Sequence, residues 1–131
     1  MCGIAGFISL NHPIDHPKSH LDSALQKLKK RGPDAQGIYR DENCELGHTR
    51  LSILDTSPAA NQPMTSENNR YMIIFNGEIY NFDNLRSDLE KSYGVNIKTS
   101  SDTEVLLNGL ILEGKSFIEK LNGFFAFCFY D

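Results

Sequence analysis

The second residue of the chain, Cys2, has the clearest potential for chemistry. If the initiator Met1 is removed, a thiol and a free α-amino group occupy the same residue. The ordinary pKa of an α-amine is about 8, close enough to neutrality for the amine to accept a proton from the thiol. Such a residue is a nucleophile that carries its own general base. The alternative is an ordinary buried cysteine, the usual state of this residue type.

The pair Asn76-Gly77 has two interpretations. Between apolar stretches, Asn-Gly is the commonest signal for a two-residue β-hairpin turn. In the functional interpretation, the Asn side-chain amide and the Gly backbone N–H form an oxyanion hole, converging on a developing negative charge. The sequence by itself favours the hairpin.

Arg50 and Asp102 are candidates for binding the charged ends of a ligand. Arg50 is either an exposed charge at the edge of a strand or a clamp that binds a carboxylate through two N–H groups. Asp102 either stabilises the N-terminus of a helix or anchors a ligand cation. For both residues the structural explanation is at least as good as the functional one.

No metal centre is predicted. Three histidines spaced by four residues are separated by prolines, which break the helix that would place them on one face. Cys44 and His48 stand without the further ligands of a tetrahedral site. A glycine-rich phosphate-binding loop is also missing, so no nucleotide site is predicted. The three histidines are His12, His16 and His20.

The composition describes one folded unit. The 131 residues have room for one domain, and 40% hydrophobic content with eight Phe and five Tyr can build a core. Thirteen basic against seventeen acidic residues give a net charge of −4, which argues against nucleic-acid binding. No apolar run approaches the roughly 20 residues of a membrane span. Three cysteines do not suit a disulfide framework, so we expect a cytoplasmic protein.

The hydrophobic periodicity predicts strands and helices in irregular order. Strands are expected at residues 3–9, 36–40, 45–54, 71–75, 95–98 and 124–130. Helices are expected at 18–30, from 82 to near 93, over 105–112 behind a capping box at 101–104, and around 117–121. Residues 56–69 are expected to form a loop. The mixture predicts an α+β architecture rather than a regular doubly wound sheet, with 71–75 buried on both faces.

Six motifs occur in one order along essentially all 131 residues, and together they resemble the class II glutamine amidotransferases. The glutaminase domain of that family is an N-terminal-nucleophile hydrolase. Pro33 and the residues after Asn76-Gly77 are similar to the asparagine synthetase branch. The motifs are Cys2-Gly3-Ile4-Ala5-Gly6, Arg31-Gly32-Pro33-Asp34, residues 47–53, 76–81, 101–104 and 121–127.

The resemblance implies a catalytic role for three residues. Cys2, freed of Met1, would attack the side-chain amide of glutamine and form a thioester. Its α-amine would act first as general base and then as the acid that helps ammonia leave. Asn76 and the Gly77 N–H would form the oxyanion hole.

The resemblance also implies how the substrate is held. Arg50 would bind the α-carboxylate of glutamine. Asp102 and Glu78 would bind its α-ammonium group. Backbone groups from Leu51 to Ile53 would line the pocket.

The fold implied is the four-layer αββα sandwich of N-terminal-nucleophile hydrolases, truncated at its C-terminal side. Residues 1–131 would be the N-terminal portion of the glutaminase domain, with no cofactor. The absent C-terminal synthetase domain would use ATP and magnesium. The alternative is an inactive truncated or unprocessed module that only binds an amino acid or a partner protein.

The apolar segment 124–130 resembles an interior strand whose neighbours lie in missing sequence. An unpaired strand edge invites pairing with another chain. We therefore expect this chain to form a homodimer, to aggregate or to leave this end disordered.

Overall fold

The computed structural model describes residues 2–53 and 55–131 of the chain. Expectations for Met1, and for the end of a strand at Leu54, lie outside these residues. The described part contains six strands, three α-helices and two 3₁₀ helices. In chain order they are β1 (Gly3–Ile8), α1 (Ser19–Leu28), β2 (Ala35–Arg40), β3 (Cys44–Arg50), η1 (Pro58–Ala60), β4 (Met64–Thr65), β5 (Met72–Ile79), α2 (Phe82–Tyr93), α3 (Asp102–Glu113), η2 (Gly114–Lys120) and β6 (Gly123–Tyr130).

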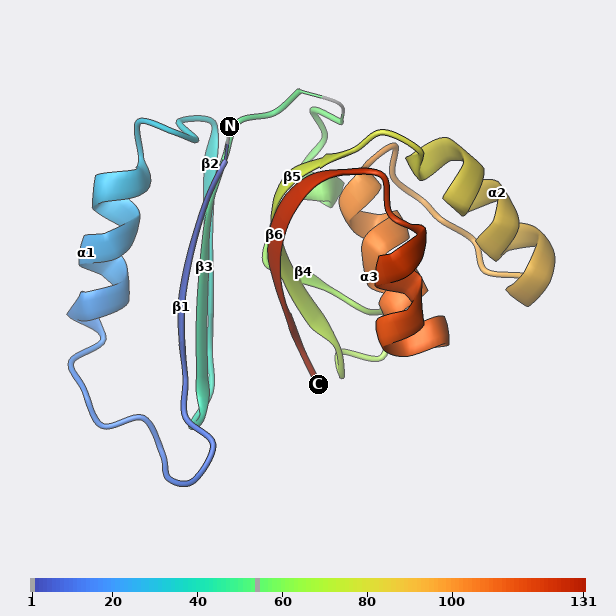
Figure 1. Cartoon of the computed structure of the whole chain (residues 1–131). Helices are drawn as coiled ribbons and strands as arrows, with labels where there is room; N and C mark the ends of the chain where they lie inside the picture. Colours follow the sequence, from blue (N-terminus) through green and yellow to red (C-terminus); the bar gives the residue numbers. More distant parts are fainter. Residues whose placement is uncertain (1, 54) are drawn as a thin grey trace.

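The strands form two antiparallel sheets. One has the order β1-β3-β2 and the other β4-β5-β6. The sheets face one another, with α1 on the outer side of the first sheet and α3 and α2 on the outer side of the second (Figure 1). This mixed architecture confirms the predicted α+β class. No helix in residues 2–53 and 55–131 is long and apolar enough to cross a membrane.

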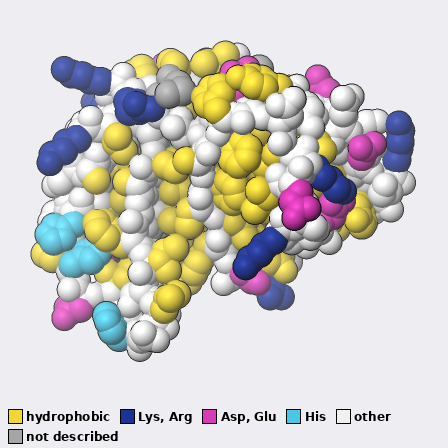
Figure 2. Space-filling model, in the orientation of Figure 1, with side chains coloured by type: hydrophobic (Ala, Val, Ile, Leu, Met, Phe, Trp, Pro, Cys, Tyr) yellow, Lys and Arg dark blue, Asp and Glu magenta, His cyan; other side chains and the backbone are white. Residues whose placement is uncertain are grey.

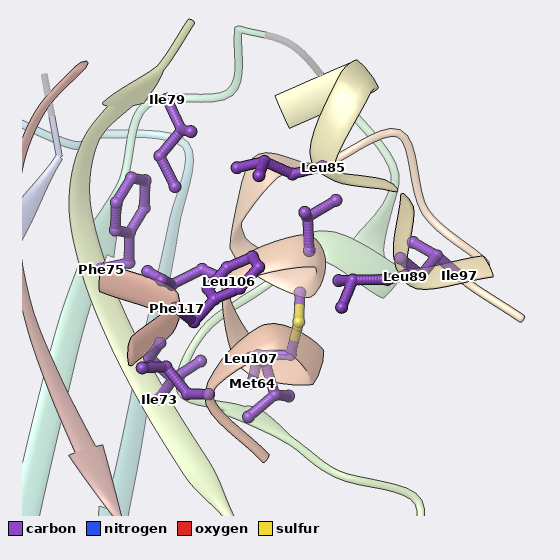
Figure 3. Close-up of a cluster of buried hydrophobic side chains, with 12 residues drawn as sticks. Met64, Ile73, Phe75, Ile79, Leu85, Leu89, Ile97, Leu106, Leu107 and Phe117 are labelled. Atoms are coloured by element: carbon purple, nitrogen blue, oxygen red, sulfur yellow. The ribbon is translucent and has the colours of Figure 1, made fainter. Parts of the chain in front are cut away.

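Strand β5 contributes to both hydrophobic clusters found among the described residues. Ile73 and Phe75 pack toward the helices, in the larger cluster shown in Figure 3. Met72 and Ile74 belong to a smaller cluster with Cys44 and other residues of the facing sheet. The prediction that this strand is buried on both faces is therefore confirmed. The larger cluster comprises Met64, Ile73, Phe75, Ile79, Leu85, Leu89, Ile97, Val105, Leu106, Leu107, Leu110 and Phe117.

Two predicted strands differ from the structure because side chains take the backbone donors. The segment 95–98 is not a strand, and the Glu104 carboxylate accepts from the N–H groups of Lys98 and Thr99. The strand predicted at 45–54 ends at Arg50, since the next N–H groups go to side chains rather than to a ladder. Side-chain acceptors of this kind compete with regular secondary structure.

The expected capping box at the start of α3 forms only in part. The Ser101 hydroxyl accepts from the Thr103 N–H at 3.1 Å, as an N-cap residue does. Glu104 does not return to the Ser101 N–H, because its carboxylate holds the preceding segment. The short helix expected around 117–121 is the 3₁₀ helix η2, and the loop 56–69 contains η1 and β4.

Strand β6 is regular and pairs with β5 along its whole length. Of the three outcomes expected for this end, namely a dimer, aggregation or disorder, the regular strand argues against disorder. On its other side β6 has no strand neighbour within the described residues. Hydrophobic side chains gather on the face of the molecule where β6 runs in front (Figure 2).

Candidate active site

One cavity of about 120 Å³ brings together all eight residues singled out from the sequence. It lies where the N-terminal end of β1, the end of β3, the second half of β5 and the start of α3 meet. The eight residues are Cys2, Arg50, Leu51, Ile53, Asn76, Gly77, Glu78 and Asp102.

Cys2 is half-buried and held on both its thiol and its carbonyl. The Leu51 N–H donates to the Cys2 Sγ at 3.4 Å. The Arg31 Nε–H donates to the Cys2 carbonyl at 3.0 Å. The same sulfur lies 3.7 Å from the Leu51 carbonyl, to which the thiol donates. Cys2 is thus not a fully buried core cysteine: it lines the cavity, with its thiol held against the Leu51 backbone.

The Arg31-Gly32-Pro33-Asp34 turn is built against the end of β3. A Cβ at Gly32 would lie 2.3 Å from the Thr49 carbonyl oxygen, so only glycine allows this approach. The Asp34 carboxylate accepts from the Ser52 N–H at 2.8 Å. The turn that ends the first helical segment therefore also fixes the backbone beside Cys2.

The hairpin interpretation of Asn76-Gly77 is wrong, because both residues lie inside β5. Asn76 pairs with Ala126 and Gly77 with Phe125 of the distant strand β6. A Cβ at Gly77 would lie 2.3 Å from the Phe124 carbonyl oxygen, so the glycine permits close strand contact rather than a turn. Tertiary pairing has overridden a local turn signal.

The residue before this pair, Phe75, has both of its backbone groups bound by buried side chains. Gln62 Oε1 accepts from the Phe75 N–H at 2.6 Å, and the Gln62 Nε2 donates to Thr103 Oγ1 at 3.2 Å. The His48 Nε2–H donates to the Phe75 carbonyl at 3.2 Å. The Gln62 side chain thus connects β5, which carries Asn76, with α3, which carries Asp102.

His48 is fully buried, and burial lowers its pKa to about 4, with a smaller contribution from the Arg50 charge. The imidazole is therefore neutral near pH 7. Its Nε2 carries the proton because its partner is a carbonyl, and its Nδ1 has no hydrogen-bond partner in the described chain. His48, which has no further ligands for a metal site among the described residues, thus fixes the backbone of β5 through the Phe75 carbonyl.

Arg50 is 7% exposed, so it is not an exposed charge at a strand edge. Its Nη1 donates to the Ser57 carbonyl at 2.8 Å and to Asn61 Oδ1 at 2.6 Å, and its Nη2 donates to the Asp55 carbonyl. Within residues 2–53 and 55–131 it forms no ion pair. A buried cation with neutral partners is suited to a ligand carboxylate.

Besides Asp55, two carboxylates line the same cavity, those of Glu78 and Asp102. Asp102 is 6% exposed, and its Oδ2 accepts from the Ile79 N–H at 3.1 Å. Burial raises the pKa of Asp102, and the nearby charge of Glu78 adds to this. A cation placed between these groups would lower the pKa of Asp102 again. Asp102 thus begins a helix and also faces the cavity.

Sequence reasoning missed seven residues that line the same cavity. Asp55 is the most informative of them: its carboxylate accepts from the N–H groups of Ser57 and Ser100. Hydrogen bonding by the Ser57 side chain, together with these two N–H groups, lowers the pKa of Asp55. The Asp-Thr-Ser spacing is a recognisable turn signal, but its long-range partner is not visible in sequence. The seven are Asp55, Ala60, Gln62, Phe75, Ser101, Thr103 and Phe124.

The cavity therefore combines a thiol near the N-terminus, a buried cation, three carboxylates and backbone donors. Among the residues that the structure describes, no cluster of three or more side chains could hold a metal ion. Two facing antiparallel sheets with such a cysteine are compatible with an N-terminal-nucleophile hydrolase domain.

Residues 1–131 match the family model of the glutamine amidotransferase domain, and the chain belongs to this family. It is 37% identical to the glutamine-hydrolyzing asparagine synthetase 3 of Bacillus subtilis (strain 168), with 100% of this chain and 21% of the relative covered. The glutamine-hydrolyzing asparagine synthetase B of Escherichia coli (strain K12) is 35% identical, covering 100% of this chain and 23% of the relative. Amidase chry2 of Gibberella zeae is 34% identical, with 100% of this chain and 21% of the relative covered. The chain thus spans about a fifth of the length of these curated relatives.

Proposed function

We propose that this chain hydrolyses glutamine to glutamate and ammonia through a thioester on Cys2. The observation that carries the proposal is the single cavity in which Cys2, Arg50, Asn76 and Asp102 meet. A free amino acid with a side-chain amide needs a nucleophile, donors at the reacting carbonyl, one fixed cation and one or two fixed anions. The cavity supplies each of these groups, and its size suits a small ligand.

The reaction proceeds in two halves. Once Met1 is removed, the α-amine of Cys2 takes the thiol proton, and the sulfur attacks the side-chain carbonyl carbon of glutamine. The ammonium then returns the proton to the leaving nitrogen, the C–N bond breaks and ammonia departs. Water, deprotonated by the same amine, attacks the thioester, and glutamate leaves as the thiol is restored.

Asn76 and the Gly77 N–H stabilise the oxyanion of both tetrahedral intermediates. The backbone just before this donor pair is held in place, which supports the role. Buried side chains bind both the N–H and the carbonyl of Phe75. A donor pair that does not need to reorganise lowers the barrier, and removal of one donor costs about 10²–10³ in rate.

Arg50 and the two carboxylates select the amino-acid end of the substrate. Arg50 binds the α-carboxylate, while Asp102 and Glu78 bind the α-ammonium group. Leu51 and Ile53 line the same cavity beside these groups.

For the whole protein we propose a larger arrangement. The order of helix, two sheets and helices corresponds to the four-layer αββα sandwich of N-terminal-nucleophile hydrolases. Ammonia passes to an ATP- and magnesium-dependent synthetase domain, by analogy with the relatives named asparagine synthetases. Amidase chry2 bears another name at similar identity, so the acceptor is left open. We place this activity in the cytoplasm, where unpaired cysteines persist.

The test is ammonia release from glutamine by the chain and by Cys2→Ala, after mass spectrometry has established that the N-terminus begins at Cys2. We expect turnover in the native chain and none in the variant. Equal turnover in both would refute the proposal. Binding of glutamate without turnover in the processed native chain would instead favour the alternative of a binding module.

A further inference from the structure

The hydrogen bonds of Arg50 leave a defined part of its guanidinium for a ligand. A guanidinium has five N–H groups. Both N–H groups of Nη1 are used, by the Ser57 carbonyl at 2.8 Å and by Asn61 Oδ1 at 2.6 Å. One N–H of Nη2 goes to the Asp55 carbonyl. The Nε–H and the second N–H of Nη2 are left.

Nε and Nη2 lie on one edge of the guanidinium plane, opposite Nη1. The Nε–H and the remaining Nη2 N–H are the two donors left for the oxygens of a ligand carboxylate. Because Nη1 is fully occupied, a carboxylate cannot use the edge that Nη1 shares with Nη2. The segment 55–61 therefore directs a ligand to the Nε side of Arg50.

Of the three acceptors, only Asn61 contributes a side chain; the other two are backbone carbonyls. Its position is fixed locally, because the Asn61 N–H donates to the Pro58 carbonyl at 3.1 Å at the end of η1. Its amide oxygen is uncharged, so it orients the guanidinium without neutralising the positive charge. A carboxylate at this position would compete with the ligand for Arg50.

We propose that Asn61 is a positioning residue that sets the specificity of this cavity for an α-carboxylate. It acts through Arg50 and does not itself contact the ligand. The proposal rests on the proposed function, in which Arg50 receives the α-carboxylate of glutamine. It adds that loss of the Asn61 oxygen frees one Nη1 N–H and releases the guanidinium from its single orientation.

The experiment measures alkylation of Cys2 by three reagents, followed by intact-mass spectrometry. The first is a chloroketone analogue of glutamine with a free α-carboxylate, the second its α-methyl ester and the third iodoacetamide. In each case the cysteine sulfur displaces halide and forms a thioether. Labelling of Cys2→Ala gives the background from Cys44 and Cys128, which are also free thiols.

For Asn61→Ala we expect a roughly tenfold lower labelling rate with the free acid at subsaturating concentration, since a hydrogen bond to a charged group is lost. The rates with the ester and with iodoacetamide should not change. The matched control is Asn11→Ala, an exposed asparagine in the loop after β1 that should leave all three rates unchanged.

Two outcomes would overturn the role of Asn61: no change with the free acid, or an equal loss with all three reagents. The second would mean that the variant damages the cavity in general. If the native chain labels no faster with the free acid than with the ester, the assignment of Arg50 itself fails. That result is separate from any effect of the variant.

Discussion

Lowering the pH from about 7.5 to about 5 is expected to destabilise the fold through His48. The imidazole is fully buried and donates to the Phe75 carbonyl as a neutral group. Burial lowers its pKa from the ordinary 6.5 to about 4. Between these values the unfolded chain binds a proton that the folded chain excludes. The stabilisation is therefore complete above pH 6.5 and is lost as the pH falls toward 4.

The size of the effect follows from the difference between the two pKa values. At about 1.4 kcal/mol for each unit, the full loss is about 3.5 kcal/mol. About 2 kcal/mol of this is lost between pH 7.5 and pH 5. That is a large share of the roughly 5–15 kcal/mol that stabilises a typical domain. Asp102, whose pKa is raised, acts in the opposite direction over the acid range.

The assay is urea unfolding at the two pH values, followed by far-ultraviolet circular dichroism. The matched variant is His48→Gln, whose amide can donate to the same carbonyl without titrating. Contributions from all other groups are common to both proteins, so the difference between their pH dependences isolates His48. We expect the native chain to lose about 2 kcal/mol more than the variant. An equal loss in both proteins would refute the reasoning.

Three further predictions follow from the same contacts. Gly32→Ala should lower the free energy of unfolding by at least about 2 kcal/mol, because its Cβ would overlap the backbone of Thr49; unchanged urea unfolding would contradict the close approach. Gln62→Met should cost roughly 2–4 kcal/mol, because it leaves the buried Phe75 N–H and Thr103 hydroxyl without their partner; a cost below about 1 kcal/mol would contradict the bridging role. In light scattering the chain should be a dimer or larger, because the outer edge of β6 has no strand neighbour in the described residues; a monomer at all concentrations would contradict this.

The sequence was enough to predict those helices and strands whose apolar residues recur at regular spacing within the element itself. In α1, Leu21 and Leu25 are fully buried, as the helical spacing indicated. The continuous apolar run that begins β5 is buried on both faces. The charged and nucleophilic candidates also meet in one cavity. They could be predicted because their types and order matched a family pattern; their spacing along the chain did not fix the distances between them.

The remaining features depend on contacts between segments far apart in the chain. Asn76-Gly77 has the composition of a turn, and only pairing with β6 keeps it in a strand. The partners of Arg50 are two carbonyls and one amide in the segment 55–61, and backbone carbonyls carry no sequence signal. Gln62 lies beside Phe75 only because β4 pairs with β5.

The central claim, that Cys2 forms a thioester with glutamine, is tested most directly by acid quench and intact-mass spectrometry of the processed chain during turnover. The account predicts a glutamyl group attached to Cys2, formed together with an equal amount of ammonia, and no such adduct in Cys2→Ala. Ammonia release that continues in Cys2→Ala, or turnover with a glutamyl group on another residue, would contradict it.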